Sequence, residues 1–319
     1  MTTEVALIIL FNHKFEKNVN RLKELYGGRF DHIFFIMPFY RGTDPQVIGV
    51  FGNSFFYQGY LAQALPEVRD DRFRHYIVIG DDLILNPAVN QINYTEYFKL
   101  GPNTGFIPDV FLLHDDVTPR PLMKTPYYWD WNINAVKFKV RQPGIEVQNE
   151  LPTYDQALRK LKDHGYAFHT TLKKSQIIKS SPDIAGTASL IEKTKEVVTW
   201  IINNMQFSIK SERKMSYPMV GSYSDIVVIP ASALDEFIHL SGVFAALQLF
   251  VEIAIPTSLL LSVDELVQEK DLAQRGMVLW KSEELSLMEK KYNSSLTALF
   301  EDFPSDTLYI HPVKLSRWC

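Results

Sequence analysis

The residues best suited to chemistry are two adjacent aspartates, Asp81 and Asp82, at the end of an apolar run. The run Tyr76–Ile79 is typical of a strand that is buried on both faces. In open α/β sheets, ligands bind at the carboxyl ends of the strands, so this position predicts a site that attracts a cation. Because successive strand side chains point to opposite faces, we expect one aspartate to hold a divalent metal and the other a water or a sugar hydroxyl. The structural alternative is a pair that only caps the turn before Asn86-Pro87.

A second candidate segment lies near the carboxyl terminus, where His311 and Lys314 follow a strand pattern at 308–310. A histidine at a strand end can give a neutral nitrogen to a divalent metal. A lysine three residues later can reach a phosphate oxygen of the same ligand, so the two side chains could share one diphosphate. A lone histidine is more often structural, but its pairing with an upstream Asp-Asp strand end favours the functional interpretation.

The third segment is a glycine-containing turn that leads into an expected strand at 226–229. Gly221 permits close approach of the backbone to a ligand, and the residues that follow offer hydroxyls and a carboxylate to a sugar. These residues are Ser222, Tyr223 and Asp225. An ordinary turn before a strand accounts for the same pattern.

Glu252 is the fourth candidate because it lies in a helical pattern that is apolar on nearly every side. A carboxylate in such surroundings needs a partner or a raised pKa, and buried acids are enriched at functional sites. Asp235 and Glu236 are competing acids with the pattern of a helix surface, and Asp225 is a third.

Two other clusters have alternative interpretations. Residues 127–131 (Tyr-Tyr-Trp-Asp-Trp) could stack on sugar rings, although such clusters more often belong to a core. His114-Asp115-Asp116 is a second acidic pair that could hold the metal instead. We prefer Asp81 and Asp82 because their strand occupies the expected depth in the series of strands and helices and leads into Asn-Pro.

Alternating strand and helix patterns predict an α/β protein with a largely parallel central sheet. The expected strands cover residues 5–11, 32–37, 47–51, 76–79, 226–229 and 308–310. The expected helices cover residues 15–26, 54–65, 154–164, 188–204, 232–238, 241–253 and 282–300. Residues 90–148 show little periodicity, which indicates an elaborated loop region over the sheet edge. We therefore expect a single domain with a variable middle.

Composition narrows the function classes. The net charge of −4 and pI near 6.1 provide no general basic field for nucleic acid, so any phosphate must bind at a local site. The single cysteine, Cys319, excludes an internal disulfide and a cysteine zinc cluster, and with no signal-peptide pattern it predicts a cytoplasmic protein. Residues 242–263 are apolar enough to suggest a membrane span, but Gln248, Glu252 and Pro256 favour a buried helix followed by a turn and a second apolar element.

These motifs together resemble those of the GT-A-fold glycosyltransferases. Asp81-Asp82-Leu83 followed by Pro87 is similar to the Asp-x-Asp metal motif, in the acidic-Asp-Asp-Leu-x-x-x-Pro form of the animal N-acetylglucosaminyltransferase I family. Gly80 stands where that form has its first acid, so only the two aspartates carry over, with Asp82 as the direct ligand. His311 resembles the carboxy-terminal histidine that completes the metal shell, with Lys314 as the basic residue behind it.

The resemblance also implies roles for other residues. Phe11 and Asn12 follow the first strand, where such enzymes receive the nucleotide base, so Asn12 is expected to hydrogen-bond a uracil edge and Phe11 to stack on it. A solvated turn is the alternative. Gly221 and Ser222 resemble the glycine loop that borders the donor sugar and the acceptor. Glu252 is similar in position to the acid near the acceptor hydroxyl, the general base of an inverting enzyme, with Asp225 as the second catalytic candidate.

The implied fold is a single GT-A-like domain, with a nucleotide-binding half at 1–90 and an acceptor-binding half at 91–319. The implied reaction moves a sugar from a nucleoside-diphosphate sugar, expected to be a UDP-sugar, to a saccharide or lipid-linked acceptor. It would use Mn²⁺ or Mg²⁺ and serve surface polysaccharide or lipopolysaccharide synthesis at the cytoplasmic membrane face. The alternatives are a non-catalytic nucleotide- or sugar-binding module, which the missing acid at Gly80 favours, and a metal-dependent phosphoesterase.

Overall fold

The computed structural model describes residues 5–113, 128–173, 176–177, 189–208 and 212–318, which contain a seven-stranded central sheet. The order of its strands is β12-β6-β11-β4-β1-β2-β3. The strands are, in chain order, β1 (Val5–Leu10), β2 (Ile33–Pro38), β3 (Val47–Val50), β4 (His75–Gly80), β6 (Thr104–Phe106), β11 (Ile226–Pro230) and β12 (Glu265–Val267). The prediction of an α/β fold is therefore confirmed.

The sheet is mixed but mostly parallel. Strands β4, β1, β2 and β3 are parallel neighbours, while β11 is antiparallel to both β4 and β6. β6 lies in the region that the sequence assigned to loops, and it pairs in parallel with β12. At three residues each, both strands are too short to show a period of two.

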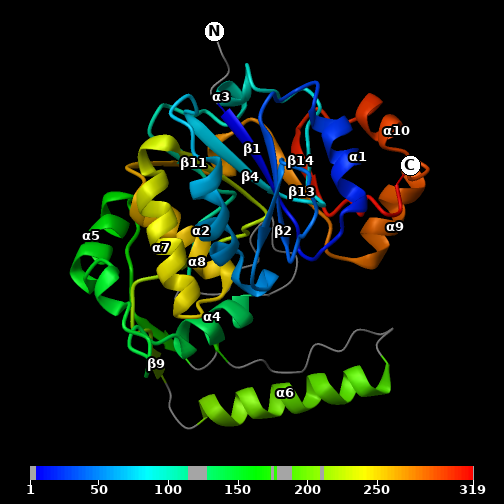
Figure 1. Ribbon diagram of the computed structural model, residues 1–319. Helices are drawn as coiled ribbons and strands as arrows, with labels where there is room; N and C mark the ends of the chain where they lie inside the picture. The colour runs from blue at the N-terminus through cyan, green and yellow to red at the C-terminus, as the bar shows by residue number, and fades with distance from the viewer. Residues whose placement is uncertain (1–4, 114–127, 174–175, 178–188, 209–211, 319) are drawn as a thin grey trace.

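Two groups of helices cover the two faces of this sheet, as Figure 1 shows. One group contains α2 (Tyr57–Val68, preceded by the 3₁₀ turn Ser54–Phe56), α7 (Leu234–Ala246) and α8 (Val251–Ser262). The other contains α1 (Lys17–Tyr26), α9 (Ser282–Lys291) and α10 (Leu296–Glu301). The protein is thus a layered α/β structure in which both sheet faces are buried.

Alternation along the central strands divides the core in two. In β4, Tyr76 and Val78 pack on the α2 side, whereas Ile77 and Ile79 pack on the α1 side. All four side chains are almost completely buried. This explains why the strand is apolar at every position, as the sequence pattern indicated.

A smaller sheet lies beside the central one, in the order β13-β14-β5. It consists of β5 (Ile84–Leu85), β13 (Arg275–Val278) and β14 (Thr307–His311). β5 follows Asp81 and Asp82 almost immediately and pairs antiparallel with β14, which ends at His311. This pairing carries the carboxyl-terminal segment to the aspartates.

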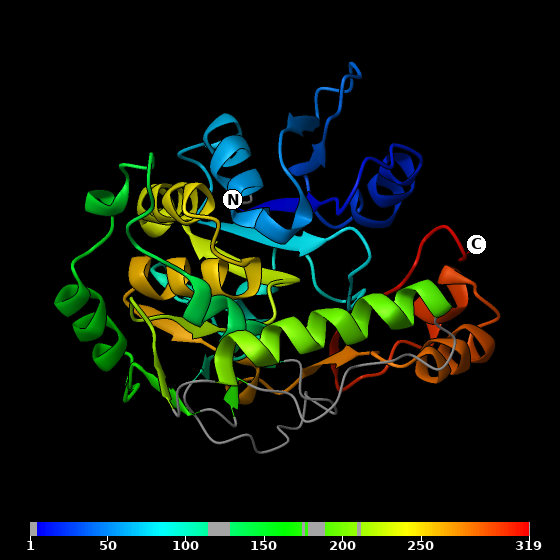
Figure 2. The same ribbon diagram turned by 90° about the horizontal axis from the view of Figure 1, so that it is seen from below.

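The remaining described elements lie between the strands and helices given above. They are α3 (Tyr94–Tyr97), β7 (Phe111–Leu112), α4 (Tyr128–Lys137), the turn Gln148–Glu150, α5 (Tyr154–Asp163), β8 (Thr171–Lys173), α6 (Leu190–Ser208), β9 (Glu212–Lys214), β10 (Val220–Gly221) and the short turns Ala231–Ala233 and Glu269–Asp271. α6 lies below the layers in Figure 1 and crosses in front of them in Figure 2. Its apolar residues Leu190, Ile191 and Ile202 are well exposed.

Three predicted helix boundaries are wrong. The expected gap between residues 238 and 241 is absent, because α7 (Leu234–Ala246) runs through it. The expected helix 241–253 spans a break between α7 and α8, where Gln248 has a φ of +57°. The expected helix 282–300 is divided into α9 and α10, with Asn293 and Ser294 at φ of +50° and +51°. A left-handed backbone cannot continue a right-handed helix, and the apolar spacing alone does not reveal it.

The break at Gln248 also divides the apolar stretch 242–263 between α7 and α8. Among the described helices, none is both long enough and apolar enough to cross a membrane.

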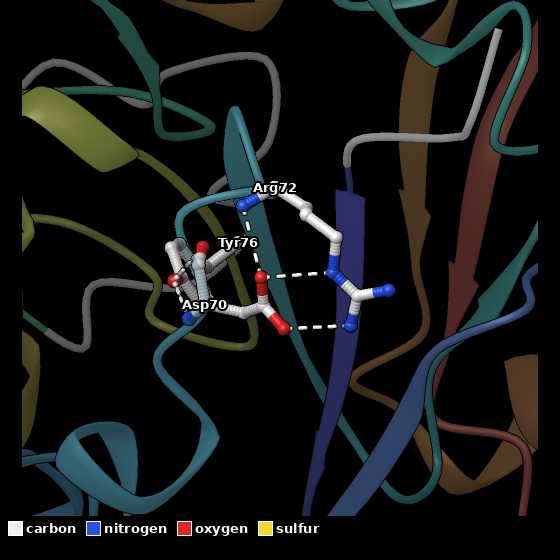
Figure 3. A network of polar contacts seen from close by, with 3 residues as sticks. All are labelled: Asp70, Arg72 and Tyr76. Atoms are coloured by element: carbon white, nitrogen blue, oxygen red, sulfur yellow. Dashed lines mark hydrogen bonds and ion pairs between the residues drawn. The ribbon is translucent and has the colours of Figure 1, made fainter.

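The turn before β4 is held by polar contacts that Figure 3 shows. Arg72 donates two hydrogen bonds to the carboxylate of Asp70, at 2.9 and 2.6 Å, and these bonds lower the pKa of that carboxyl to about 2. The backbone N–H of Asp70 donates to the hydroxyl of Tyr76 at 3.2 Å. The amino end of β4 is therefore anchored by groups that satisfy one another.

Candidate functional site

A polar cavity of about 440 Å³ lies at the carboxyl edge of the parallel strands. It is lined by residues from the ends of β1 and β4, the start of α2, the residues before β11 and α8, and the segment after β14. Seven of the predicted site residues line it, namely Asn12, Asp81, Asp82, Asp225, Glu252, His311 and Lys314. The sheet edge thus gathers residues that are far apart in sequence.

Backbone hydrogen bonds fix the position of the two aspartates. The N–H of Gly80 donates to the carbonyl of Asp225 at 2.9 Å, and the N–H of Asp81 donates to the carbonyl of Leu10 at 2.9 Å. The carbonyl of Asp82 accepts from the N–H of Val313 at 2.7 Å. The aspartates are therefore tied to β1, to β11 and to the carboxyl-terminal segment.

Asn86 secures the same segment from the other side. Its backbone N–H donates to the carbonyl of Leu308 at 2.8 Å, and its side-chain amide donates to the carbonyl of Thr307 at 2.7 Å. These bonds, together with the β5–β14 pairing, explain how His311 reaches residues that precede it by some 230 positions.

Asp82 contacts two cationic side chains from this segment. One carboxylate oxygen lies 3.2 Å from Nε2 of His311, and the other accepts a hydrogen bond from Nζ of Lys314. Burial alone would raise the pKa of the Asp82 carboxyl, but the hydrogen bond from His311 and the charges of His311 and Lys314 hold it well below its usual range. Asp82 is therefore ionised over the neutral pH range.

Asp81 shows the opposite behaviour although it is the adjacent residue. Burial, followed by repulsion from the Asp82 carboxylate, raises the pKa of Asp81 to about 7. The Asn12 backbone and the charge of Lys314 oppose that shift only in part. A cation beside both carboxylates would relieve their repulsion.

His311 lies between two carboxylates. Its Nδ1 is 3.6 Å from Oδ2 of Asp225, beyond hydrogen-bonding distance, and this buried atom has no hydrogen-bond partner among the described residues. Burial alone would lower the pKa of His311, but the charge of Asp225 and the hydrogen bond with Asp82 raise it to about 8. Burial raises the pKa of Asp225, although the charge of His311 opposes this shift.

Glu252 reaches the cavity from the first turn of α8 and is oriented by a buried tryptophan. Nε1 of Trp131 in α4 donates a hydrogen bond to Oε2 of Glu252. Trp131 is itself fixed, because its ring stacks on Phe111 and meets Tyr223 edge-on, with ring centroids 5.0 and 5.7 Å apart. Glu252 therefore lines the cavity with a side chain that Trp131 holds in position.

Phe11, Gly221 and Ser222 do not line the cavity. Phe11 is fully buried on the α1 side of the sheet and packs edge-on against Phe35. Because strand side chains alternate, Leu10 and Asn12 face the cavity while Phe11 faces the core. The prediction that Phe11 stacks on a base is therefore wrong.

Ser222 contacts the backbone of Glu252, and Gly221 lies against Trp131, which holds the Glu252 side chain. The backbone N–H of Ser222 donates to the carbonyl of Glu252 at 2.9 Å, and the Ser222 side chain is fully buried. A Cβ at Gly221 would lie 2.8 Å from the ring of Trp131. The glycine makes room for the tryptophan, and neither Gly221 nor Ser222 is part of the cavity lining.

The alternative candidates lie elsewhere. Asp235 forms an exposed ion pair with Arg69, and Glu236 lines a different groove. In the aromatic cluster, Trp131 belongs to the core beside Glu252, and Tyr127 lies outside the described residues. The second acidic segment, residues 114–116, also lies outside them.

Sequence reasoning missed three aromatic residues that line the cavity, Phe55, Tyr57 and Phe250. The rings of Phe55 and Phe250 are in contact, with centroids 4.4 Å apart. Burial, followed by the charges of Asp81, Asp225 and Asp82, raises the pKa of Tyr57, which keeps its hydroxyl protonated. Phe55 and Tyr57 follow β3 at the same sheet edge as the aspartates, so the strand-end rule could have identified them.

The described residues contain no group of three or more His, Cys, Asp and Glu side chains arranged to hold a metal ion. The donor chemistry nevertheless fits a divalent cation, because two adjacent carboxylates repel each other and the buried Nδ1 of His311 has no hydrogen-bond partner among the described residues. Magnesium-type ions are commonly held by one or two carboxylates together with substrate phosphates. The predicted ligands Asp81, Asp82 and His311 suit an ion that arrives with a diphosphate.

No protein-family model matches this chain, and no curated protein sequence matches it. The function must therefore be argued from the geometry of the cavity.

Proposed function

We propose that the protein is a metal-dependent glycosyltransferase of the GT-A type that uses a nucleoside-diphosphate sugar, with a UDP-sugar as the expected donor. The observation that carries the proposal is the convergence of Asp81, Asp82, His311 and Lys314 on one cavity at the carboxyl edge of the parallel strands. Carboxylates, an imidazole and an ammonium group at one point suit a cation and a diphosphate together.

Different side chains would bind the cation, the diphosphate and the nucleobase. Asp82 and Asp81 would hold Mn²⁺ or Mg²⁺ with help from His311, and a bound ion supplies charge neutralisation to the departing diphosphate. Lys314, which contacts Asp82 in this structure, would be available to bind a phosphate oxygen of the diphosphate. Asn12 offers hydrogen bonds to the nucleobase, and Phe55 offers a ring for it to stack on.

The acceptor hydroxyl must lose a proton as it attacks the sugar in an inverting transfer. Glu252 is placed to accept that proton because its carboxylate lines the cavity and is oriented by Trp131. Asp225 is the second candidate, and it lies closer to the imidazole of His311. The protonated hydroxyl of Tyr57 can donate to a sugar or phosphate oxygen.

One observation favours a second candidate function, a nucleotide- or sugar-binding module without catalysis. Gly80 provides no acid before the two aspartates, and the charge of Asp82 is already balanced by His311 and Lys314. Such a module would use the same cavity.

A donor panel separates these possibilities. The assay measures nucleoside diphosphate release from several UDP-sugars and GDP-sugars, with Mn²⁺ and with EDTA, in the wild-type protein, in Asp82→Ala and in the surface control Asp71→Ala. A glycosyltransferase releases diphosphate from one donor, needs the metal, loses activity in Asp82→Ala and keeps it in Asp71→Ala. A binding module releases none, and a phosphoesterase cleaves simple phosphate esters without a sugar donor.

The proposed acceptor is a saccharide or a lipid-linked saccharide, as in surface polysaccharide or lipopolysaccharide synthesis. A peripheral association with the cytoplasmic face of a membrane would be compatible with a lipid-linked acceptor. Activity on free oligosaccharides, compared with the same glycans on a lipid carrier in vesicles, tests this part of the proposal separately.

A further inference from the structure

A second cavity of about 530 Å³ lies outside the carboxylate site. It forms where the segment after α4, the start of α5 and the residues near Tyr217 meet. Two hydrogen bonds hold these parts together: Ser216 donates to the carbonyl of Phe138 at 2.9 Å, and Tyr217 donates to the carbonyl of Pro152 at 2.8 Å. We call this cavity the basic groove.

The basic groove carries positive charge that the described residues do not neutralise. Lys139 and Arg141 line it and are exposed, and neither side chain forms a hydrogen bond or ion pair within the described part of the chain. No carboxylate lines it among those residues. The nearby Glu150 lines a different groove, where its carboxylate lies 3.7 Å from His239. The groove is therefore suited to an anion.

Its other walls suit a saccharide. The exposed ring of Tyr154 can stack on a sugar face, and the amides of Gln148 and Asn149 can donate to and accept from sugar hydroxyls. The hydroxyls of Thr153 and Ser216 add to this polar surface. Two cations beside an aromatic ring and several amides favour a sugar chain that carries acid groups over a simple inorganic anion.

Two segments connect the basic groove to the reaction cavity. In α4 (Tyr128–Lys137), Trp131 donates a hydrogen bond to Glu252, and Lys137 lies two residues before Lys139. The second segment runs from Ser216 and Tyr217 in the groove to Ser224 and Asp225 in the cavity. An acceptor chain that reached both sites would place its acidic group in the groove and its reacting hydroxyl near Glu252.

We propose that the basic groove is a distal subsite for an acidic acceptor saccharide, whose carboxylate groups bind Lys139 and Arg141 and whose sugar ring stacks on Tyr154. This inference rests on the proposed transferase function for its role, but binding in the groove is independent of catalysis. A direct binding measurement therefore separates a failure of the subsite from a failure of the transferase proposal.

The test is calorimetric titration of the whole protein with a defined acidic oligosaccharide, oligogalacturonate, and with a neutral oligosaccharide of the same length. We expect the acidic chain to bind and the neutral chain to bind at least tenfold more weakly. In Lys139→Ala/Arg141→Ala, affinity for the acidic chain should fall by a factor of about ten or more, since hydrogen bonds to charged groups contribute at this level. Binding should also weaken with added salt.

A matched control removes the same charge elsewhere. Lys193→Ala/Lys195→Ala, on α6, changes the net charge equally and should leave the affinity unchanged. Tyr154→Phe should keep most of the affinity and Tyr154→Ala should lose it, because stacking needs the ring and not the hydroxyl. Because these side chains are exposed, the variants should remain folded, which circular dichroism checks; the single variant Lys139→Gln serves if the double variant does not fold.

Three results would overturn the proposal. The first is no binding of the acidic chain to the wild-type protein. The second is an equal loss of affinity in the control double variant, which would indicate only general electrostatic attraction. The third is equally tight binding of inorganic phosphate that is abolished in Lys139→Ala/Arg141→Ala, which would make the groove an anion site with no preference for a saccharide.

Discussion

An Asp-Asp pair adjoins each end of strand β4, with His75 at the amino end and His311 of β14 beside the carboxyl end, but the surroundings differ. At the amino end, Arg72 satisfies Asp70 with two hydrogen bonds, as seen in Figure 3. At the carboxyl end, Asp81 and Asp82 repel each other and share one neighbourhood of cations. Residue type alone does not distinguish a structural acidic pair from a functional one. The hydrogen-bond and ion-pair partners of each carboxylate do.

The two histidines repeat this contrast. His75 is fully buried, and both ring nitrogens are hydrogen-bonded, Nδ1 to the hydroxyl of Tyr94 at 2.9 Å and Nε2 to the carbonyl of Gly101 at 3.0 Å. Because a carbonyl only accepts, Nε2 carries a proton, and burial lowers the pKa of His75, which favours the neutral ring. His311 has a buried Nδ1 without a hydrogen-bond partner in the described chain. A group whose bonds are complete supports the fold, and one whose bonds are incomplete can receive a ligand.

The largest expected effect separates the two acidic pairs. Asp82→Ala should lower donor turnover on the order of 10³-fold, because the proposed cation loses its principal ligand. Asp70→Asn, at the other end of β4, should leave turnover unchanged. Steady-state diphosphate release from both variants measures this, with circular dichroism to verify folding. Equal losses in the two variants would contradict the division between a structural and a functional end.

The second effect concerns His75 and stability. Burial lowers the pKa of His75 to about 4, below its ordinary value of 6.5. Between pH 4 and pH 6.5 the unfolded protein binds a proton at His75 that the folded protein does not bind. The stability that the neutral, buried His75 contributes is therefore fully present above pH 6.5 and is lost as the pH falls toward 4. The loss amounts to about 3 kcal/mol in the free energy of unfolding.

Urea unfolding of the wild-type protein and of His75→Gln, in steps from pH 7.5 to pH 4, measures this contribution. The variant should be less stable at pH 7.5, and the difference between the two proteins should shrink as the pH falls. A constant difference over the whole range would show that His75 does not stay neutral in the fold.

The third effect tests Glu252. Glu252→Gln keeps the shape of the side chain but removes the base, and kcat should fall by about 10²-fold while the donor KM changes little. The pH profile of the residual activity should lose its acidic limb. If instead Asp225→Asn produces this loss and Glu252→Gln does not, the assignment of the base is reversed.

The smallest effect tests how Gly221 acts. A methyl group there would meet the ring of Trp131 at 2.8 Å, so Gly221→Ala should shift the tryptophan and the carboxylate it holds. We expect kcat to fall about tenfold and stability to fall by about 1–3 kcal/mol, as in other overpacked cores. A raised donor KM with unchanged kcat would favour the original idea of direct ligand contact.

The sequence was sufficient to predict some of the residues at the ends of buried strands. The apolar run before Asp81 and the short strand before His311 each predict that a polar residue follows at the end of a strand. The structure brings these two strand ends together. Asn12 lines the cavity, whereas Phe11 lies in the core. The period of two places neighbouring residues on opposite faces of a strand, at the end of β1 as at Asp81 and Asp82.

The parts that could not be predicted depend on long-range packing. No local pattern indicates that Trp131 supports Glu252, because the two residues are brought together only by the packing of α4 near α8. Phe250 was hidden inside an expected helix, although it lies in the break before α8. Strand β6 belongs to the central sheet because it pairs with β11 and β12. Its own three-residue sequence does not predict a strand.

The proposed function requires a cavity that binds a cation and a nucleoside diphosphate as one unit, and titration of UDP into the protein measures this binding without an acceptor. With Mn²⁺ present, UDP should bind the wild-type protein, and the affinity should fall at least tenfold with EDTA or in Asp82→Ala. UDP binding that is equally tight with EDTA and in Asp82→Ala, or no binding under any of these conditions, would contradict the account.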